Sequence, residues 1–170
     1  MHQTIRIIAA LLVVILAAGS VGLAIGSKDT AYCGGTVPGF EGAKNIIGGL
    51  LDTTNPNYLV WASTSKAFHG KTIKIAYDRI IDLEYGQKAG RRVGTAVATT
   101  VLFGPRGLVS MLSKKRRHFL TVGYKDDSSK DQVAVLEIGK DIVGTTLAIV
   151  ETRSGKKVQY QDEKARNSAK

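Results

Sequence analysis

The sequence predicts a mainly β fold, a small curved sheet or barrel, with one amphipathic α-helix near the C-terminus that covers an open end. Three observations lead to this class. Short apolar stretches alternate with turn residues over most of the chain, and residues 141–153 have helical spacing instead. In addition, 44% of the 170 residues are hydrophobic, which is enough for one core.

Residues 1–27 precede these elements and predict an export signal. Arg6 and the terminal amine form a short positive region, and residues 7–25 are an uncharged run rich in Leu, Ile, Val and Ala. The run is also close to the ~20 residues of a membrane-spanning helix, so a cleaved signal peptide and a retained anchor are both compatible with it. In either case we expect the rest of the chain to be periplasmic or extracellular.

The predicted strands follow one another at short intervals. Alternation is clear in residues 79–85, where Ile81, Leu83 and Tyr85 are expected on one face. Residues 125–130 are polar and predict the loop of a hairpin. The expected strands cover residues 32–37, 48–52, 58–63, 71–77, 79–85, 117–124, 132–138 and 158–161.

The helix is predicted over residues 141–153. Val143, Leu147 and Val150 fall on one helical face, and Gly155 suits the C-terminal end. A strand is the alternative here, because the β-branched residues and an internal glycine weaken helix propensity.

The length predicts a single domain, which we place over residues 28–163, followed by a charged tail of residues 164–170. The chain has one cysteine, Cys33, which excludes a scaffold held together by disulfides. A buried structural thiol is expected for it, with intermolecular pairing as the alternative.

The formal net charge of +10 is concentrated in one stretch. No acidic residue lies between Glu84 and Asp126, and the rest of the chain has 15 cations and 14 anions. Such a concentration indicates either an anionic partner or a solvated basic face. The candidate contacts with an anionic surface are the nine cations of this stretch, Lys88, Arg91, Arg92, Arg106, Lys114, Lys115, Arg116, Arg117 and Lys125.

Residues 93–112 form an apolar insertion between two clusters of these cations. Three interpretations are open. The apolar arms pack on the sheet as part of the structure, or they dip into a membrane while the cations contact lipid headgroups, or they contact a partner protein or a second copy of the chain. The candidate membrane-dipping or partner-contacting residues are Val93, Val97, Val101, Leu102, Phe103, Leu108, Val109, Met111 and Leu112.

Three stretches carry a resemblance to a known group of proteins: LEYGQKAGRRVG, SKKRRHFLTVGY and VLEIGKDIVGTTLAIVETRSGK. Over nearly all of residues 31–163, the chain resembles uncharacterised bacterial exported proteins with a pleckstrin-homology-like (PH/GRAM-like) domain. The resemblance implies a pleckstrin-homology-like sheet or barrel and a binding scaffold for lipid headgroups, peptides or proteins. The chain departs from the group at Gly144, where a charged residue follows the DIV motif in the relatives.

Motifs for catalysis, metals and cofactors are not found in the sequence. His69 and His118 lie in no zinc-binding pattern, and the acidic loop before Gln132 lacks the spacing of a calcium loop. Nucleic acid is disfavoured as a partner because of the export signal, and no small-molecule substrate is indicated. We therefore expect a non-enzymatic binding or structural module of the cell envelope whose partner is anionic lipid or an envelope protein. The alternative is protein–protein interaction or self-association through the apolar segment, and a hydrolase is less favoured.

Overall fold

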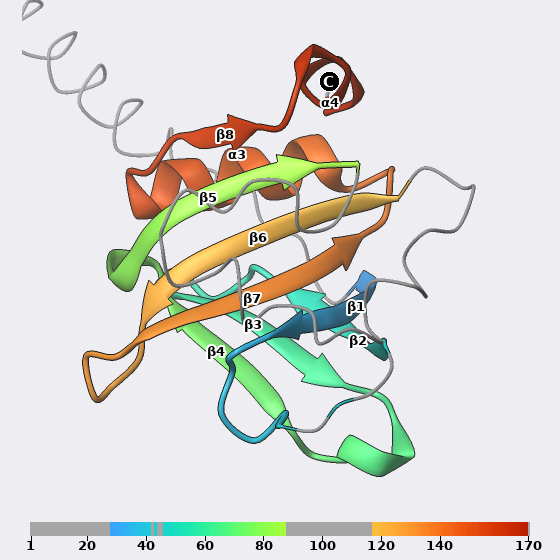
Figure 1. The fold of residues 1–170 in the computed structure, drawn as a ribbon, viewed down its shortest axis with the longest axis vertical. Helices are drawn as coiled ribbons and strands as arrows, with labels where there is room; N and C mark the ends of the chain where they lie inside the picture. Colours follow the sequence, from blue (N-terminus) through green and yellow to red (C-terminus); the bar gives the residue numbers. More distant parts are fainter. Residues whose placement is uncertain (1–27, 42, 44–45, 88–116, 170) are drawn as a thin grey trace, which may run out of the picture.

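The computed structural model describes residues 28–41, 43, 46–87 and 117–169. Within these ranges the chain is mainly β with a C-terminal α-helix, which confirms the predicted class (Figure 1). In chain order the elements are β1 Lys28–Gly35, β2 Ile47–Asp52, β3 Tyr58–Ser63, η1 Lys66–Phe68, β4 Thr72–Ala76, η2 Tyr77–Arg79, β5 Ile80–Gly86, β6 His118–Lys125, β7 Asp131–Ile138, α3 Val143–Ser154, β8 Val158–Tyr160 and α4 Glu163–Ser168. None of the helices in the described ranges has the length and apolar character needed to cross a membrane.

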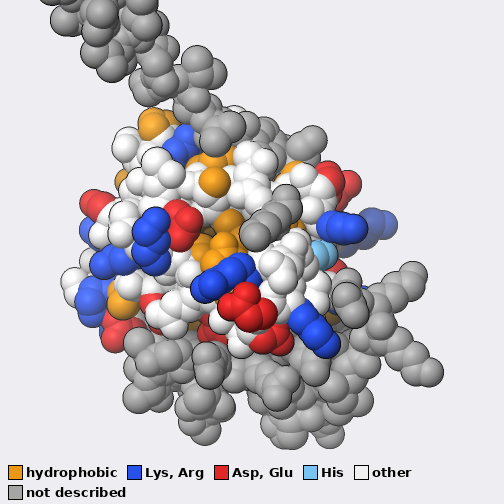
Figure 2. Space-filling view, turned by 90° about the horizontal axis from the view of Figure 1, so that it is seen from above, with side chains coloured by type: hydrophobic (Ala, Val, Ile, Leu, Met, Phe, Trp, Pro, Cys, Tyr) orange, Lys and Arg blue, Asp and Glu red, His pale blue; other side chains and the backbone are white. Residues whose placement is uncertain are grey.

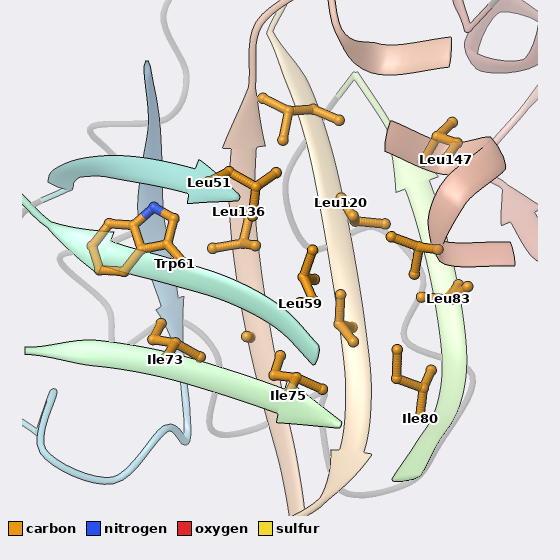
Figure 3. Packing of buried hydrophobic residues seen from close by; sticks show 14 of the residues in the cluster. Leu51, Leu59, Trp61, Ile73, Ile75, Ile80, Leu83, Leu120, Leu136 and Leu147 are labelled. Atoms are coloured by element: carbon orange, nitrogen blue, oxygen red, sulfur yellow. The ribbon is translucent and has the colours of Figure 1, made fainter. Parts of the chain in front are cut away.

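The eight strands form one sheet in the order β4-β3-β2-β1-β7-β6-β5-β8. Neighbouring strands are antiparallel except β5 and β8, which are parallel. The sheet curves so that β2, β3 and β4 face β5, β6 and β7 across the core. Figure 3 shows Leu51, Leu59 and Ile75 from the first group pointing toward Leu120 and Leu136 from the second. Burial of these apolar side chains stabilises the curved arrangement, in which the two groups of strands face each other.

An aromatic cluster closes one end of this core. The Phe40 ring stacks on Phe68 at 5.5 Å between centroids and meets Tyr32 at 5.0 Å and Trp61 at 5.8 Å. Trp61 is fully buried, and its indole N–H donates to the Thr30 hydroxyl at 3.0 Å. The Thr30 hydroxyl thus satisfies the one polar group of the indole, as a buried tryptophan requires.

The prediction that Ile81 shares the buried face of β5 with Leu83 and Tyr85 is wrong. A bulge between Ile80 and Asp82 shifts the register of β5 against β6. As a result Ile80 is buried, whereas Ile81 is 37% exposed. A bulge inserts one unpaired residue and so reverses the alternation at that point of the strand.

α3 covers the core beside β5, with Val143, Leu147 and Val150 buried as predicted. Gly155 follows in the left-handed conformation with φ of 68°, and its N–H donates to the Glu151 carbonyl. Such a residue is the usual end of a helix, and glycine adopts it without a Cβ clash. The alternative of a strand in this segment is therefore wrong.

The stretch expected as a charged tail, residues 164–170, contains most of α4 in the structure. The Asp162 carboxylate accepts the Ala165 N–H at 2.8 Å and caps the helix, and Ala165 is buried. The end of α4 lies against α3, because a Cβ on Gly144 would be only 2.9 Å from the Ala169 carbonyl oxygen. This close approach leaves no room for a side chain at position 144.

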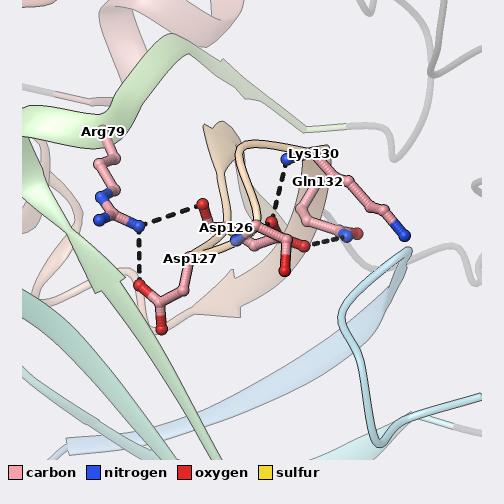
Figure 4. Close-up of polar contacts among 6 residues, drawn as sticks. Arg79, Asp126, Asp127, Lys130 and Gln132 are labelled. Atoms are coloured by element: carbon pink, nitrogen blue, oxygen red, sulfur yellow. Dashed lines mark hydrogen bonds and ion pairs between the residues drawn. The ribbon is translucent and has the colours of Figure 1, made fainter.

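The acidic loop between β6 and β7 is a hairpin turn built on Asp126 (Figure 4). The Asp126 carboxylate accepts two loop N–H groups and the Gln132 amide, and these bonds hold its pKa below the usual value. Arg79 of η2 donates to Asp127 at 2.7 Å and to the Asp126 carbonyl at 3.1 Å. The carboxylates of this loop thus stabilise the turn.

Candidate functional site

Most of the predicted contact residues lie outside the described residues. This holds for the apolar candidates Val93, Val97, Val101, Leu102, Phe103, Leu108, Val109, Met111 and Leu112. It holds also for the cations Lys88, Arg91, Arg92, Arg106, Lys114, Lys115 and Arg116.

The structure describes two of the predicted cations, Arg117 and Lys125, and each forms an ion pair. Arg117 Nη1 lies 2.8 Å from Glu137 Oε2, and Lys125 Nζ lies 2.7 Å from Asp131 Oδ1. The two cations stand at opposite ends of β6, about 27 Å apart at ~3.4 Å per residue. Lys125 is therefore distant from the point where the insertion joins the sheet, and we leave it out of the contact surface.

The insertion of residues 88–116 starts and ends at one place on the sheet. The last residue of β5, Gly86, pairs with Phe119 near the start of β6, and the β5–β6 ladder continues from there. The two strands are thus paired up to the residues that flank the insertion. The insertion is an excursion from a hairpin that is already closed by its own hydrogen bonds.

The positive charge of the chain is concentrated in the insertion. Outside it, residues 28–87 and 117–170 contain 16 basic and 14 acidic residues, a formal net charge of +2. On the face seen in Figure 2, blue and red side chains are accordingly intermixed. Residues 88–116 contain seven basic residues and no acidic one, so they supply +7 of the net charge of +10.

A polar cluster lies at the end of the sheet where residues 88–116 are attached. The Tyr85 hydroxyl of β5 is 2.5 Å from His118 Nδ1, at the start of β6. The same hydroxyl is 3.2 Å from Ser168 Oγ, and Ser168 in turn donates to the Ala165 carbonyl at 2.8 Å. The cluster joins β5 and β6 to α4 at the end of the sheet where the insertion is attached.

Burial keeps the members of this cluster neutral. Desolvation lowers the pKa of His118, the nearby Lys140 lowers it further, and Glu137 opposes them. Desolvation also raises the pKa of Tyr85, while the hydrogen bond between Tyr85 and Ser168 acts in the other direction. At neutral pH an uncharged phenol is therefore hydrogen-bonded to an uncharged imidazole. Within the described ranges, no three His, Cys, Asp or Glu residues gather to hold a metal ion.

The lowered pKa of His118 predicts a stability that falls on acidification. Between the folded pKa and the unfolded value of about 6.5, the unfolded chain binds the extra proton, so the unfolding free energy rises with pH in this window. We expect His118→Asn, which retains a polar atom near Tyr85, to flatten this slope. Urea denaturation at a series of pH values between 7.5 and about 5 checks it. An unchanged difference between parent and variant across the series would contradict the assignment.

Sequence reasoning missed this cluster. His118 looked isolated because its partners come from distant parts of the chain, and Ser168 fell in the expected tail. Only the contact between Tyr85 and His118 could have been found from the sequence. If the strands on either side of the insertion pair as a hairpin, Tyr85 lies opposite Leu120, and His118 is then its diagonal neighbour.

No protein-family model matches the chain, and no curated protein matches it. Among solved structures, the chain is similar to the hSac2 domain from the human phosphoinositide phosphatase Sac2. The TM-score is 0.48 and the sequence identity 12%, with 94% of this chain and 89% of that chain covered. This is a likeness in coarse fold, and no activity is carried from that protein to this chain.

Proposed function

We propose that the chain is a non-catalytic module of the cell envelope, exported through residues 1–27, that attaches to an anionic membrane surface. The observation that carries the proposal is the charge distribution. A domain whose other residues, 28–87 and 117–170, have a net charge of only +2 bears one excursion, residues 88–116, with seven cations and no anion. Each cation near an anionic leaflet contributes about 1 kcal/mol, so such a cluster supplies several kcal/mol at low salt.

The location of the cations favours a surface over a discrete ligand pocket. Six of the seven fall into two groups, which flank the ends of the excursion around Arg91 and Lys115, and Arg106 lies between the groups in the sequence. Both groups lie within a few residues of the same point on the sheet, because Gly86 pairs with Phe119. Cations tethered to one point contact an extended anionic surface together, and their attraction to it is screened by salt.

Binding to vesicles tests the proposal. The protein is residues 28–170, which contain every described element, and the vesicles are phosphatidylcholine with or without one third phosphatidylglycerol. We expect sedimentation with the anionic vesicles only, and its loss at high salt. Neutralising three cations with Lys114→Gln, Lys115→Gln and Arg116→Gln should lower the partition constant about 100-fold, at ~1 kcal/mol for each charge.

A matched variant controls for net charge alone. Lys156, Lys157 and Lys164 are exposed cations of the described domain, and changing all three to glutamine removes the same charge. We expect this variant to bind like the parent. Equal losses in the two triple variants would show that net charge and not the insertion drives binding, and absence of binding to anionic vesicles would refute the proposal.

A further inference from the structure

Strand β4 has a free edge. It stands at one end of the strand order and pairs with β3 on one side, and among the described strands none pairs with its other side (Figure 1). Thr72 and Lys74 are exposed, so solvent reaches this edge along most of the strand. Such an edge has a row of backbone N–H and C=O groups to which another extended segment can bind.

The register of the β3–β4 ladder shows which backbone groups face the free edge. The Ser63 N–H donates to the Lys71 carbonyl at 2.9 Å, so these residues form a hydrogen-bonded pair at the end of the ladder. Hydrogen-bonded pairs recur at every second position of an antiparallel ladder. Ile73 and Ile75 therefore bond with β3. The N–H and C=O groups directed to the free edge are those of Thr72, Lys74 and Ala76.

The hairpin of β3 and β4 is basic. Residues 53–77 contain no acidic residue and three lysines, Lys66, Lys71 and Lys74. All three are exposed, and none of them forms an ion pair with another described residue. Glu41 lies near Lys71, but its carboxylate accepts a neighbouring backbone N–H at 2.8 Å. The free edge is thus bordered by positive charges that are available to a partner.

The side chain of Lys74 leaves the backbone of the edge accessible. A lysine on an edge strand is a common means of preventing unwanted strand pairing. The Lys74 Nζ, however, lies 4.1 Å from the centre of the Tyr58 ring, which belongs to β3. The side chain is therefore directed over the sheet toward β3 and away from the free edge, where a cation–π contact holds it.

These charges decide between the possible occupants of the edge. Two β4 strands that paired about a two-fold axis would bring their lysines together, and like charges opposite each other destabilise a strand pair. An anionic lipid would attract the lysines, but it has no row of N–H and C=O groups to continue the ladder. An extended peptide segment with Asp or Glu side chains complements both the backbone groups and the charge.

We infer that the free edge of β4 binds an extended acidic segment of a partner protein, which adds to the sheet as a strand beside β4. The backbone groups of Thr72, Lys74 and Ala76 pair with the segment, and its carboxylates lie near the three lysines. The inference goes beyond the proposed function, which gives no role to β4.

A synthetic peptide tests the inference. The probe is a dye-labelled octapeptide of alternating Glu and Val, which is acidic and contains a residue that favours strands. Fluorescence anisotropy measures its binding to the full chain in an uncharged detergent. We expect saturable binding of this peptide and no binding of an octapeptide of alternating Lys and Val. A Glu-Val peptide with every amide nitrogen methylated keeps the charge but donates no hydrogen bonds, and it should bind at least about tenfold more weakly.

A proline variant tests the backbone of the edge without changing the charge. Thr72→Pro removes one N–H that points to the free edge. Proline is tolerated at such a position, because the ladder with β3 does not use this N–H. We expect the variant to bind the acidic peptide about tenfold more weakly than the parent. The fluorescence of Trp61, the single tryptophan and fully buried, shows whether the domain is folded.

A triple variant tests the charge. Lys66→Gln, Lys71→Gln and Lys74→Gln together should weaken binding of the acidic peptide about tenfold, as expected for three exposed charge contacts. The matched control removes the same charge from exposed positions elsewhere, with Lys156→Gln, Lys157→Gln and Lys164→Gln. This control should bind the peptide like the parent.

Residue-resolved amide hydrogen exchange is a second measurement, and it needs no variant. The peptide should slow exchange of the Thr72, Lys74 and Ala76 amides about tenfold or more. The amides of Ile73 and Ile75 already donate to β3 and should change little. This alternation along β4 distinguishes a strand added at the edge from a peptide that binds elsewhere on the domain.

Several outcomes would overturn the inference. They are no binding of the acidic peptide, equal binding of the methylated peptide, equal losses in the two triple lysine variants, or slowed exchange that does not alternate along β4. A dimer of the chain alone in which these edge amides are already protected would show that a second copy occupies the edge. Loss of binding to anionic vesicles in the Lys66, Lys71 and Lys74 variant, with no binding of the peptide to the parent, would assign these lysines to lipid instead.

Discussion

Gly49→Ala is expected to lower the free energy of unfolding by about 3 kcal/mol, at the upper end of the range for overpacked cores. A Cβ on Gly49 would overlap the Trp61 ring and stand 2.5 Å from the Ala62 carbonyl oxygen. The ring has no free direction, because it is fully buried and meets Phe40 and Tyr32 at 5.8 and 6.0 Å. Either β2 and β3 must separate or the aromatic cluster must rearrange.

The neighbouring glycine is a matched control. Gly48 is exposed, and a Cβ there would meet only the Thr64 hydroxyl, at 3.5 Å. Gly48→Ala should therefore change the unfolding free energy by no more than about 0.5 kcal/mol. Urea denaturation followed by the fluorescence of Trp61 measures both variants. Equal effects at the two positions would contradict the packing argument.

The strands were predictable from sequence wherever alternation and turn residues agreed. The strand expected at residues 58–63 has the same bounds in the structure, and the predicted hairpin at residues 125–130 joins β6 to β7. Ile81 shows the limit of this approach. Ile81 lies in a strand, as the alternating pattern predicts. Because of the bulge between Ile80 and Asp82, however, Ile80 faces the core in place of Ile81, and a pattern of apolar and polar residues does not encode a bulge.

The C-terminal helix α4 shows a second limit. Its sequence is dominated by charges, which predicts a solvated tail. It is held by the buried side chain of Ala165, by the cap from Asp162 and by its approach to Gly144. The last of these contacts depends on the tertiary structure, and local composition contains no signal for it. The contact of Ser168 with Tyr85 could not be predicted from the sequence for the same reason.

The concentration of basic residues, in contrast, can be identified from the sequence alone, because it depends only on the order of the residues along the chain. The interval between Glu84 and Asp126 is free of acidic residues, and the structure adds where that interval is attached. It also separates Lys125 from the other cations, since β6 carries it to the opposite end of the sheet. The candidate contacts with an anionic surface are therefore the cations of residues 88–116 and Arg117, without Lys125.

Arg153→Met is expected to lower the free energy of unfolding by about 2–3 kcal/mol, the range for hydrogen bonds from a charged group. Arg153 stands in the last turn of α3, and its Nη1 donates to the carbonyls of Thr53 and Asn55 at 2.5 and 2.9 Å. The same nitrogen is 3.3 Å from the Tyr77 hydroxyl, and the guanidinium lies 5.4 Å from the centre of that ring. One side chain thus joins α3 to the β2–β3 turn and to η2.

Arg153→Lys tests how much of the stabilisation comes from the positive charge and how much from the shape of the guanidinium group. Arg153→Lys keeps the positive charge near the helix C-terminus but loses the planar guanidinium, whose Nη1 reaches both carbonyls while the group lies over the Tyr77 ring, so we expect it to recover about half of the loss. Lys156→Met, an exposed position nearby in the sequence, controls for removal of a charge and should cost less than about 0.5 kcal/mol. Urea denaturation of the three variants checks the order, and equal losses in Arg153→Met and Lys156→Met would contradict it.

The position of Arg153 also predicts which part of α3 becomes less stable in Arg153→Met. The N-terminal half of α3 is held independently, because Gly144 lies against Ala169 at the end of α4. Removal of the guanidinium should therefore release the C-terminal turn first. Amide hydrogen exchange should increase around Val150 and Arg153 while the amide of Leu147 stays protected. If exchange increased uniformly along α3, the helix would open as one unit, and Arg153 would hold all of α3 in place rather than its last turn alone.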